Sequence, residues 1–301
     1  MIEAYLKRFV ECRTINEVNH VHIAMTNLMT PREAVLLLKE ITRHAGSFLP
    51  RNVDADKAKV LRSTAVGNIT RAARDVVGTG KATAEPYGRR ALAKGLHVFS
   101  DGTGRAAKTL LIGFSGNAER LMMPTPIILQ NIDAASVDVA VLRDLRKAGY
   151  RDGLEGIGDS LEALIDALPD LLAFSDYRRV ATLGTSGGAL PALLAGLRLR
   201  ADAAMSVGGN GPDDPRWQRP DGIGARELIA AYAGSHSRTR VALVHGAQSP
   251  RDQAAAEAIA ALVAATLVPV SDPAGPVGHG ALYPLVGQRR LAAFLKEHLG
   301  L

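Results

Sequence analysis

A strand-like run that enters a Gly-x-Ser-x-Gly turn constrains this chain more than any other feature of its sequence. The apolar run covers residues 180–183, the turn is Gly184-Thr185-Ser186-Gly187-Gly188, and an Ala/Leu-rich segment follows. The glycines two residues before and two after Ser186 remove side chains where a strand and a helix approach closely. Such a turn projects the serine hydroxyl clear of the backbone, beside the N-terminal end of the helix. The pattern therefore predicts a nucleophilic serine, and the alternative interpretation is a Gly-Ser-Gly turn without chemistry.

The composition is typical of a folded protein and argues against a nucleic-acid partner. Of the 301 residues 47% are hydrophobic and 22% are charged, which excludes a disordered chain. No apolar run reaches the roughly 18 residues that cross a bilayer, and residues 1–10 lack the apolar core of a secretory signal. The single cysteine, Cys12, excludes an internal disulfide, so we expect a reducing, cytoplasmic location. Scattered arginines with few aromatic residues produce the net charge of +6, which predicts no nucleic-acid partner.

The pattern of apolar residues changes near residue 90 and predicts two parts. In residues 1–90 apolar positions recur at helical spacing, with helices expected over 1–12, from 31 to near Gly46, and over 54–77. Thr30-Pro31-Arg32-Glu33 combines an N-cap, a proline in the first turn and a glutamate that closes a capping box. We expect residues 1–90 to form an N-terminal helical unit that is a lid, an interface or a docking surface. A homodimer or a protein partner could bind through it.

Residues 91–301 carry the pattern of an α/β domain. Strands are predicted over 96–99, 109–114, 137–142, 180–183, 203–207, 241–244 and 266–270, and helices over 158–173, 187–199, 251–265 and 287–299. This alternation predicts a mostly parallel twisted sheet with helices on both faces. The first two strand runs could instead form an antiparallel hairpin at the sheet edge. Sites in such sheets form at the carboxyl ends of the strands.

A nucleophilic serine needs a base within hydrogen-bond reach and an acid that orients that base. The best candidate base is His279, which lies in a glycine-rich loop after the last predicted strand and before the C-terminal helix. Asp252 is the candidate acid, since it follows the strand run 241–244; it could also serve only as part of a helix cap. Asp213, Asp214 and Asp272 remain alternative acids.

The oxyanion that forms during acyl transfer needs two backbone N–H donors aimed at one point. Gly187, directly after the serine, is expected to supply one. The second is expected from the turn Ser115-Gly116-Asn117 after a buried strand run, through the amide of Asn117 or of Gly116. The alternative interpretation of that turn is an ordinary strand end.

Residues 95–301 resemble the α/β-hydrolase family. The resemblance is carried by Gly184-Thr185-Ser186-Gly187-Gly188 and by Gly278-His279, and it implies a serine esterase in which Ser186 is the nucleophile and His279 the base. The sequence departs from the family pattern at Ser249, where the acid usually stands. It also lacks the family's histidine in the oxyanion loop.

The expected reaction is hydrolysis of an ester or thioester of a small molecule through an acyl-enzyme, with no cofactor or metal. His20-Val21-His22 would place two imidazoles on one side of a strand, but no third ligand follows at metal-binding spacing. Alternatives are an acyltransferase or peptidase with the same triad, and a non-catalytic protein that binds a partner through its N-terminal helices. Arg143, Asp144, Arg151 and Asp152 are expected either to shape a polar substrate pocket or to form a solvated loop.

Overall fold

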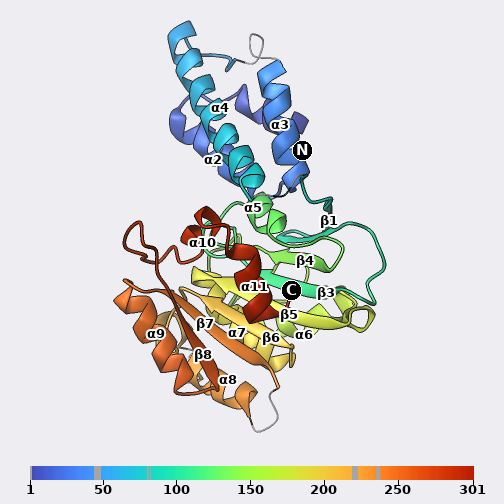
Figure 1. Ribbon diagram of the computed structural model, residues 1–301, viewed down its shortest axis with the longest axis vertical. Helices are drawn as coiled ribbons and strands as arrows, with labels where there is room; N and C mark the ends of the chain where they lie inside the picture. The colour runs from blue at the N-terminus through green and yellow to red at the C-terminus, as the bar shows by residue number, and fades with distance from the viewer. Residues whose placement is uncertain (1, 44–48, 80, 82, 219–222, 235–237) are drawn as a thin grey trace. The chain divides into compact units, whose positions relative to one another are not determined.

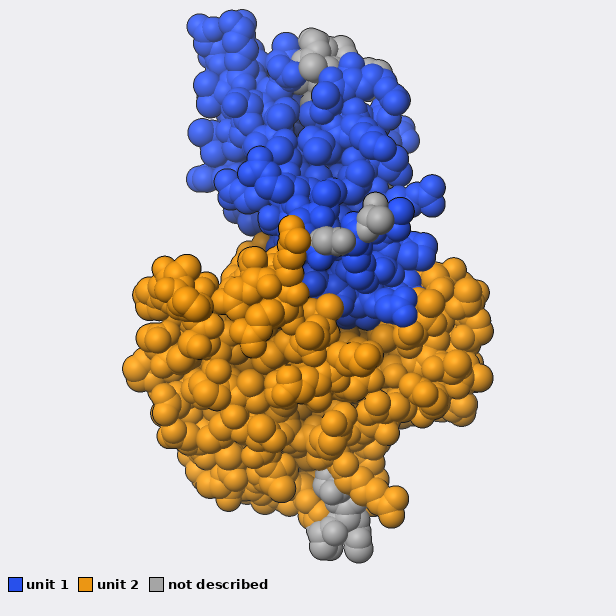
Figure 2. Space-filling view, viewed as in Figure 1, with its two compact units in different colours: residues 1–88, 124–134 blue, residues 89–123, 135–301 orange. Residues whose placement is uncertain are grey.

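The computed structural model describes residues 2–43, 49–79, 81, 83–218, 223–234 and 238–301 (Figure 1). Backbone contacts divide the chain into two compact units, which Figure 2 shows in different colours. The first contains residues 1–88 and 124–134, and the second contains residues 89–123 and 135–301. The segment 124–134 thus groups with the N-terminal helices, although it lies within residues 91–301, the range predicted for the α/β domain.

The first unit is helical. Its helices are α1 (Ile2–Phe9), α2 (Ile15–Thr26), α3 (Pro31–Arg43), α4 (Ala55–Val77) and α5 (Thr125–Gln130). The expected capping box at the start of α3 is confirmed: the Thr30 N–H donates to Glu33 Oε2 at 2.9 Å, and the Glu33 N–H donates to Thr30 Oγ1 at 3.2 Å. The predicted end of this helix near Gly46 lies outside the described residues.

One apolar core holds α1 to α4 together. It includes the buried side chains Tyr5, Phe9, Val18, Leu37, Ile41, Leu61 and Ile69. The prediction that His20 and His22 share one side of a strand is wrong, because both lie on α2, where residues two apart do not face each other. Among the described helices, none is long and apolar enough to span a membrane.

The second unit is built on an eight-stranded sheet with the order β1-β2-β4-β3-β5-β6-β7-β8. The strands are β1 (Gly88–Ala93), β2 (Leu96–Ser100), β3 (Thr109–Phe114), β4 (Val137–Leu142), β5 (Arg179–Thr185), β6 (Ala203–Val207), β7 (Arg240–Gly246) and β8 (Ala265–Val270). From β4 to β8 every neighbouring pair is parallel, and β2 pairs antiparallel with β4. The alternative hairpin of 96–99 with 109–114 is therefore wrong, since β4 lies between β2 and β3. The predicted class, a mostly parallel α/β sheet, is confirmed.

Helices cover this sheet and enclose its central strands. They are α6 (Leu161–Leu171), α7 (Ala189–Arg198), α8 (Ala225–Ala233), α9 (Pro250–Ala260), α10 (Tyr283–Gly287) and α11 (Leu291–Leu299). All six residues of β3 and all six of β4 are buried, as expected for strands covered on both faces. Figure 1 shows α9 along β8 at one edge of the sheet and α11 over β6. The predicted helix 287–299 is α11, which begins at Leu291, and the short α10 precedes it.

Candidate active site

The serine turn lies where β5 passes into α7. Ser186 has a φ of 52°, in the left-handed region that a non-glycine residue seldom adopts. It opens a short 3₁₀ turn, Ser186–Gly188, before α7 begins at Ala189. Such strain persists where the surrounding structure holds it and is common at catalytic positions. The geometry is that of a nucleophile elbow.

Two glycines make this turn sterically possible. A β-carbon added to Gly184 would lie 2.1 Å from the carbonyl oxygen of Gly188, and one added to Gly188 would lie 2.3 Å from that of Phe114. Both distances are far below van der Waals contact. The Gly-x-Ser-x-Gly spacing is therefore a packing requirement of the strand, the turn and the neighbouring strand β3.

His279 and Asp252 form a hydrogen-bonded pair. The imidazole Nδ1 of His279 lies 2.9 Å from Oδ2 of Asp252. The aspartate side chain, in the first turn of α9, is 6% exposed, whereas the histidine side chain is 56% exposed. A carboxylate that accepts from Nδ1–H leaves Nε2 unprotonated, and Nε2 can then accept a proton from a serine hydroxyl. The structure thus brings the candidate base and the candidate acid together.

Hydrogen bonds between two loops hold His279 in place. The Val277 N–H donates to Gln248 Oε1 at 2.7 Å, and the Gln248 N–H donates to the Val277 carbonyl oxygen at 3.0 Å. Gln248 follows β7 and Val277 follows β8, so these bonds fasten the histidine loop to the end of β7. Asp252 stands four residues beyond Gln248, within reach of the imidazole.

The end of β6 links the histidine to the serine turn. Gly208 has a φ of 57°, and a β-carbon added to it would lie 3.1 Å from both Cε1 and Nδ1 of His279. A β-carbon on the next residue, Gly209, would lie 2.9 Å from Cβ of Ala189, the first residue of α7. Residues 208–209 therefore contact the imidazole and the start of α7, which follows Ser186 closely.

The alternative acids are engaged elsewhere. Asp213 accepts two hydrogen bonds from Arg226, at 2.7 and 2.5 Å, and this guanidinium lowers the pKa of Asp213. Arg216 lowers the pKa of Asp214 in the same way, through bonds of 2.9 and 2.7 Å. Asp272 accepts a backbone N–H of its own turn at 3.0 Å. Asp252 is therefore the carboxylate that contacts His279.

The turn after β3 lies against the serine turn. A β-carbon added to Gly116 would lie 3.1 Å from Cβ of Ser186, and one added to Gly187 would lie 2.7 Å from Oδ1 and 3.8 Å from the backbone nitrogen of Asn117. The Gly116 N–H already donates to the Arg120 carbonyl oxygen at 3.1 Å. In the described loops, the N–H group of Asn117 makes no such bond. Of the two candidates on this turn, Asn117 is thus the better placed oxyanion donor.

Sequence reasoning did not anticipate Tyr150, which supports the turn after β3. Its hydroxyl donates to the Leu142 carbonyl oxygen at 2.7 Å and lies 3.2 Å from Oγ of Ser115. Its backbone N–H donates to Oδ2 of Asp144 at 3.0 Å, and burial raises the pKa of the phenol. An aromatic residue inside a highly charged loop was the available signal, because such a ring needs an apolar site while its hydroxyl needs a partner.

The strained serine at the end of β5, on a mostly parallel sheet with a His–Asp pair beyond later strands, decides the fold family. The chain has an α/β-hydrolase fold. In this α/β-hydrolase fold the three residues occur in the chain order Ser186, Asp252 and His279, the order typical of the fold. Residues 1–88 of the helical first unit precede the α/β-hydrolase sheet, and its segment 124–134 lies between β3 and β4 in the chain.

Comparison with known proteins adds similarities of fold at low sequence identity. No protein-family model matches this sequence, and no curated protein matches it. Similar solved structures include the enterobactin esterase FES from Shigella flexneri, with 17% identity over 72% of this chain and a TM-score of 0.49. The chain spans 61% of the length of that esterase.

Two further structures are similar over different shares of this chain. The 2,6-dihydroxy-pseudo-oxynicotine hydrolase matches 99% of this chain and 88% of its own, at 15% identity and a TM-score of 0.49. The fluorophosphonate-binding serine hydrolase FphF from Staphylococcus aureus matches 70% of this chain and 98% of its own length, at 11% identity and a TM-score of 0.49. The assignment of the α/β-hydrolase fold to this chain rests on its own sheet and serine turn.

Proposed function

We propose that this protein is a serine hydrolase that cleaves a carboxylic ester or thioester through an acyl-enzyme. The observation that carries the proposal is the 2.9 Å contact between His279 and buried Asp252, in a fold that also holds Ser186 at a φ of 52°. An imidazole fixed by a carboxylate is the base that a serine hydroxyl requires, because the hydroxyl is a weak nucleophile by itself.

The proposed reaction has two acyl transfers. The Ser186 oxygen attacks the carbonyl carbon while His279 Nε2 takes the hydroxyl proton, and the negative charge on the carbonyl oxygen is stabilised by the N–H groups of Gly187 and Asn117. Asp252 offsets the charge of the imidazolium. The imidazolium then gives its proton to the leaving alkoxide or thiolate, and the acyl group stays on the serine.

Water completes the cycle. His279 takes a proton from a water molecule, whose oxygen attacks the acyl carbon, and the imidazolium returns that proton to the Ser186 oxygen as the acid leaves. An ester or thioester fits this residue set best, since its leaving group needs one proton and no further assistance. The set contains a nucleophile, a base, an orienting acid and two oxyanion donors, which together suffice for acyl transfer.

A panel of 4-nitrophenyl acyl esters and acyl-thioesters tests the proposal. The wild type is expected to hydrolyse at least one chain length, with a rapid first turnover if deacylation limits the rate, and Ser186→Ala is expected to lose this activity. Retention of the wild-type rate by Ser186→Ala would contradict the proposal. Added alcohols or amines that divert the acyl group from water would indicate an acyltransferase instead.

A further inference from the structure

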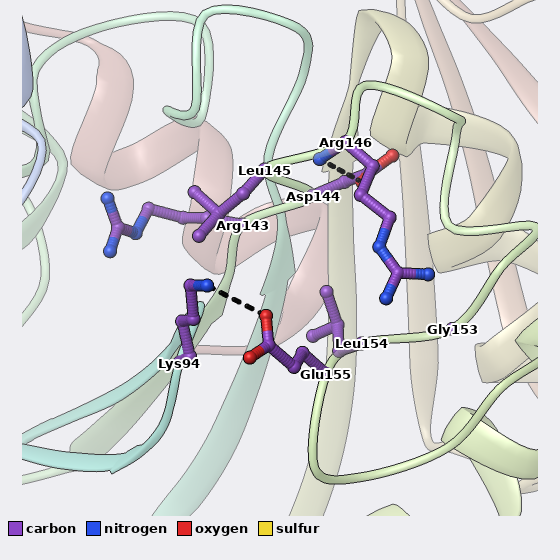
Figure 3. A pocket seen from close by; sticks show the side chains of 8 residues that line it. All are labelled: Lys94, Arg143, Asp144, Leu145, Arg146, Gly153, Leu154 and Glu155. Atoms are coloured by element: carbon purple, nitrogen blue, oxygen red, sulfur yellow. Dashed lines mark hydrogen bonds and ion pairs between the residues drawn. The ribbon is translucent and has the colours of Figure 1, made fainter.

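A pocket at the carboxyl end of β4 lies outside the residues of the proposed reaction. Its volume is about 200 Å³, and it is lined by Lys94, Arg143, Asp144, Leu145, Arg146, Gly153, Leu154 and Glu155 (Figure 3). Arg143 and Asp144, two of the four residues expected to shape a polar pocket, are among these residues, whereas Arg151 and Asp152 are not. The cavity is smaller than the 300–1,000 Å³ typical of a site for a whole ligand, so it suits one small chemical group.

The charges around this pocket leave positive charge in excess. Three cationic and two anionic side chains line it. Both oxygens of Asp144 accept backbone N–H groups, from Arg146 and from Tyr150, at 3.0 Å each. Glu155 bonds Lys94 at 2.8 Å in an exposed pair, which water screens. Both lining carboxylates are thus bonded within the protein. The lining side chains alone carry one more positive than negative charge, with Glu119, which contacts Arg143 from outside the lining, not counted.

Arg143 is the buried member of the set. It is 9% exposed, and its nearest carboxylate contact is Glu119, at 3.4 Å from Nη1. In the part of the chain that the structure describes, its Nε has no hydrogen-bond partner. A guanidinium offers five N–H donors, and among the described residues Arg143 bonds Glu119 through Nη1 while its Nε has no partner. Burial also lowers the pKa of Arg143, which is the expected sign for a desolvated cation.

His97, a neighbour of Arg143, adds no charge at neutral pH. Burial, together with the charges of Arg143 and Arg89, lowers the pKa of His97 to about 4, so the imidazole is neutral at pH 7. Figure 3 shows the charged ends of Lys94 and Arg143 on one side of the pocket and that of Arg146 on the other. Two cations on one side of a small cavity favour an oxyanion such as a carboxylate or a phosphate.

The pocket lies within reach of a substrate held at Ser186. In the strand order β4-β3-β5, the end of β4 is two strand spacings, or about 10 Å, from the end of β5. The loop that lines the pocket also reaches the serine turn, since a β-carbon added to Gly149 would lie 3.9 Å from the Gly187 carbonyl oxygen. An extended chain of eight to nine carbons spans about 10 Å.

We propose that Lys94 and Arg143 bind the terminal carboxylate or phosphate of an anionic ester whose acyl carbon lies at Ser186. The position of the acyl carbon rests on the proposed hydrolase function, whereas the anion site does not depend on it. The enzyme would then prefer acyl chains that end in an oxyanion over neutral chains of equal length. Carboxylate and phosphate share the chemistry that a guanidinium recognises, so separate substrates must distinguish them.

The kinetic test compares three 4-nitrophenyl esters of equal reach: the hydrogen suberate, a phosphonate-ended analogue and the neutral octanoate. Lys94→Gln and Arg143→Gln are each expected to raise KM for the preferred anionic ester about tenfold, with the octanoate changed less than twofold. Lys147→Gln removes a charge from the same loop but not from the pocket, and is expected to change neither. Equal losses on charged and neutral esters would overturn the proposal.

A binding test separates the anion site from the chemistry. Suberate and inorganic phosphate are titrated calorimetrically into folded Ser186→Ala, alone and combined with Lys94→Gln, an exposed position that folding tolerates. Saturable binding of one anion that is weakened about tenfold by Lys94→Gln supports the site, even if no ester is hydrolysed, in which case the proposed function alone fails. Absence of binding by both anions overturns the site.

Discussion

The imidazole of His279 and the carboxylate of Asp252 are hydrogen-bonded at 2.9 Å although 27 residues separate them in the chain. The aspartate is buried and the histidine is half exposed. This division fits their proposed roles, because the orienting acid benefits from a fixed, dry position and the base must reach the substrate. Asp252 and the two bonds between Gln248 and Val277 together position the imidazole.

Replacing Asp252 by Asn is expected to lower kcat about 10³- to 10⁴-fold with little loss of stability. The amide can donate to Nδ1 and so favours the tautomer whose Nε2 is protonated, which cannot take the serine proton. Steady-state hydrolysis of the best ester measures the effect. Asp272→Asn is the matched control, since Asp272 accepts N–H groups of its own turn and of Gln288, and its rate is expected to stay within a few-fold of wild type.

Tyr150→Phe is expected to lower kcat about threefold to tenfold while KM and the pH profile stay close to wild type. The variant loses the 2.7 Å bond to the Leu142 carbonyl oxygen, which is worth about 1 kcal/mol and helps to fix the turn before Asn117. Because the base is untouched, the pH dependence of kcat should not move. A shifted pH profile would contradict a role confined to positioning.

Gly184→Ala is expected to reduce the free energy of unfolding by about 3 kcal/mol, because its new methyl group would overlap the Gly188 carbonyl oxygen at 2.1 Å. Denaturant unfolding of the whole protein measures the change in the free energy of unfolding. Gly104→Ala is the control, as a β-carbon there would meet nothing within 4 Å, and its effect should stay within about 0.5 kcal/mol. Equal effects of the two substitutions would argue against the steric account of the turn.

At the other end of the sheet, Lys108 is buried between two carboxylates. Its Nζ donates to Asp138 at 2.9 Å and also to Asp101, and the Tyr177 hydroxyl donates to Asp138. Burial acts to lower the pKa of Lys108, but the bonds to the two carboxylates outweigh it and raise the pKa above the usual 10.5. Burial likewise acts to raise the pKa of Asp101, yet the bonds from Lys108 and Thr103 outweigh it and hold the pKa below 3.8.

These directions predict how stability depends on pH. The contribution of Asp101 is present above pH 3.8 and is lost as the pH falls through the lower pKa of the folded state. That of Lys108 is present below pH 10.5 and is lost as the pH rises through the higher pKa of the folded state. Asp101→Asn is therefore expected to lower Tm at pH 7, with a difference from wild type that shrinks below pH 3.8. A difference that stays constant down to pH 2 would contradict the ion-pair account.

The central strands were predictable because each is a continuous apolar run. β3, β4 and β6 have the predicted bounds, since buried parallel strands are apolar on both faces and polar turns flank them. β1 was missed because Gly88-Arg89-Arg90-Ala91-Leu92-Ala93 shows no regular apolar alternation. None of its six residues is buried: three are exposed and three are intermediate. The short α5 was missed because all six of its residues are buried, which leaves no amphipathic pattern.

The candidate site was predictable where one segment determines the geometry. The serine turn is formed by consecutive residues, so its glycines and the apolar residues on either side predict it. The contact between Asp252 and His279 depends on Gln248, which joins the loop after β7 to the loop after β8. No local sequence pattern predicts that these two loops meet. Tyr150 and the pocket beside it likewise depend on a loop folding back on the ends of β3 and β4.

Labelling with a fluorophosphonate, followed by peptide mass spectrometry, tests the central claim most directly. The reagent phosphonylates a serine only where a base and oxyanion donors activate it. We predict one modified residue, Ser186, with labelling slowed at least 10²-fold in His279→Ala and in Asp252→Asn. Folded wild-type protein that stays unlabelled at Ser186, or that labels equally fast in both variants, would contradict the proposed triad.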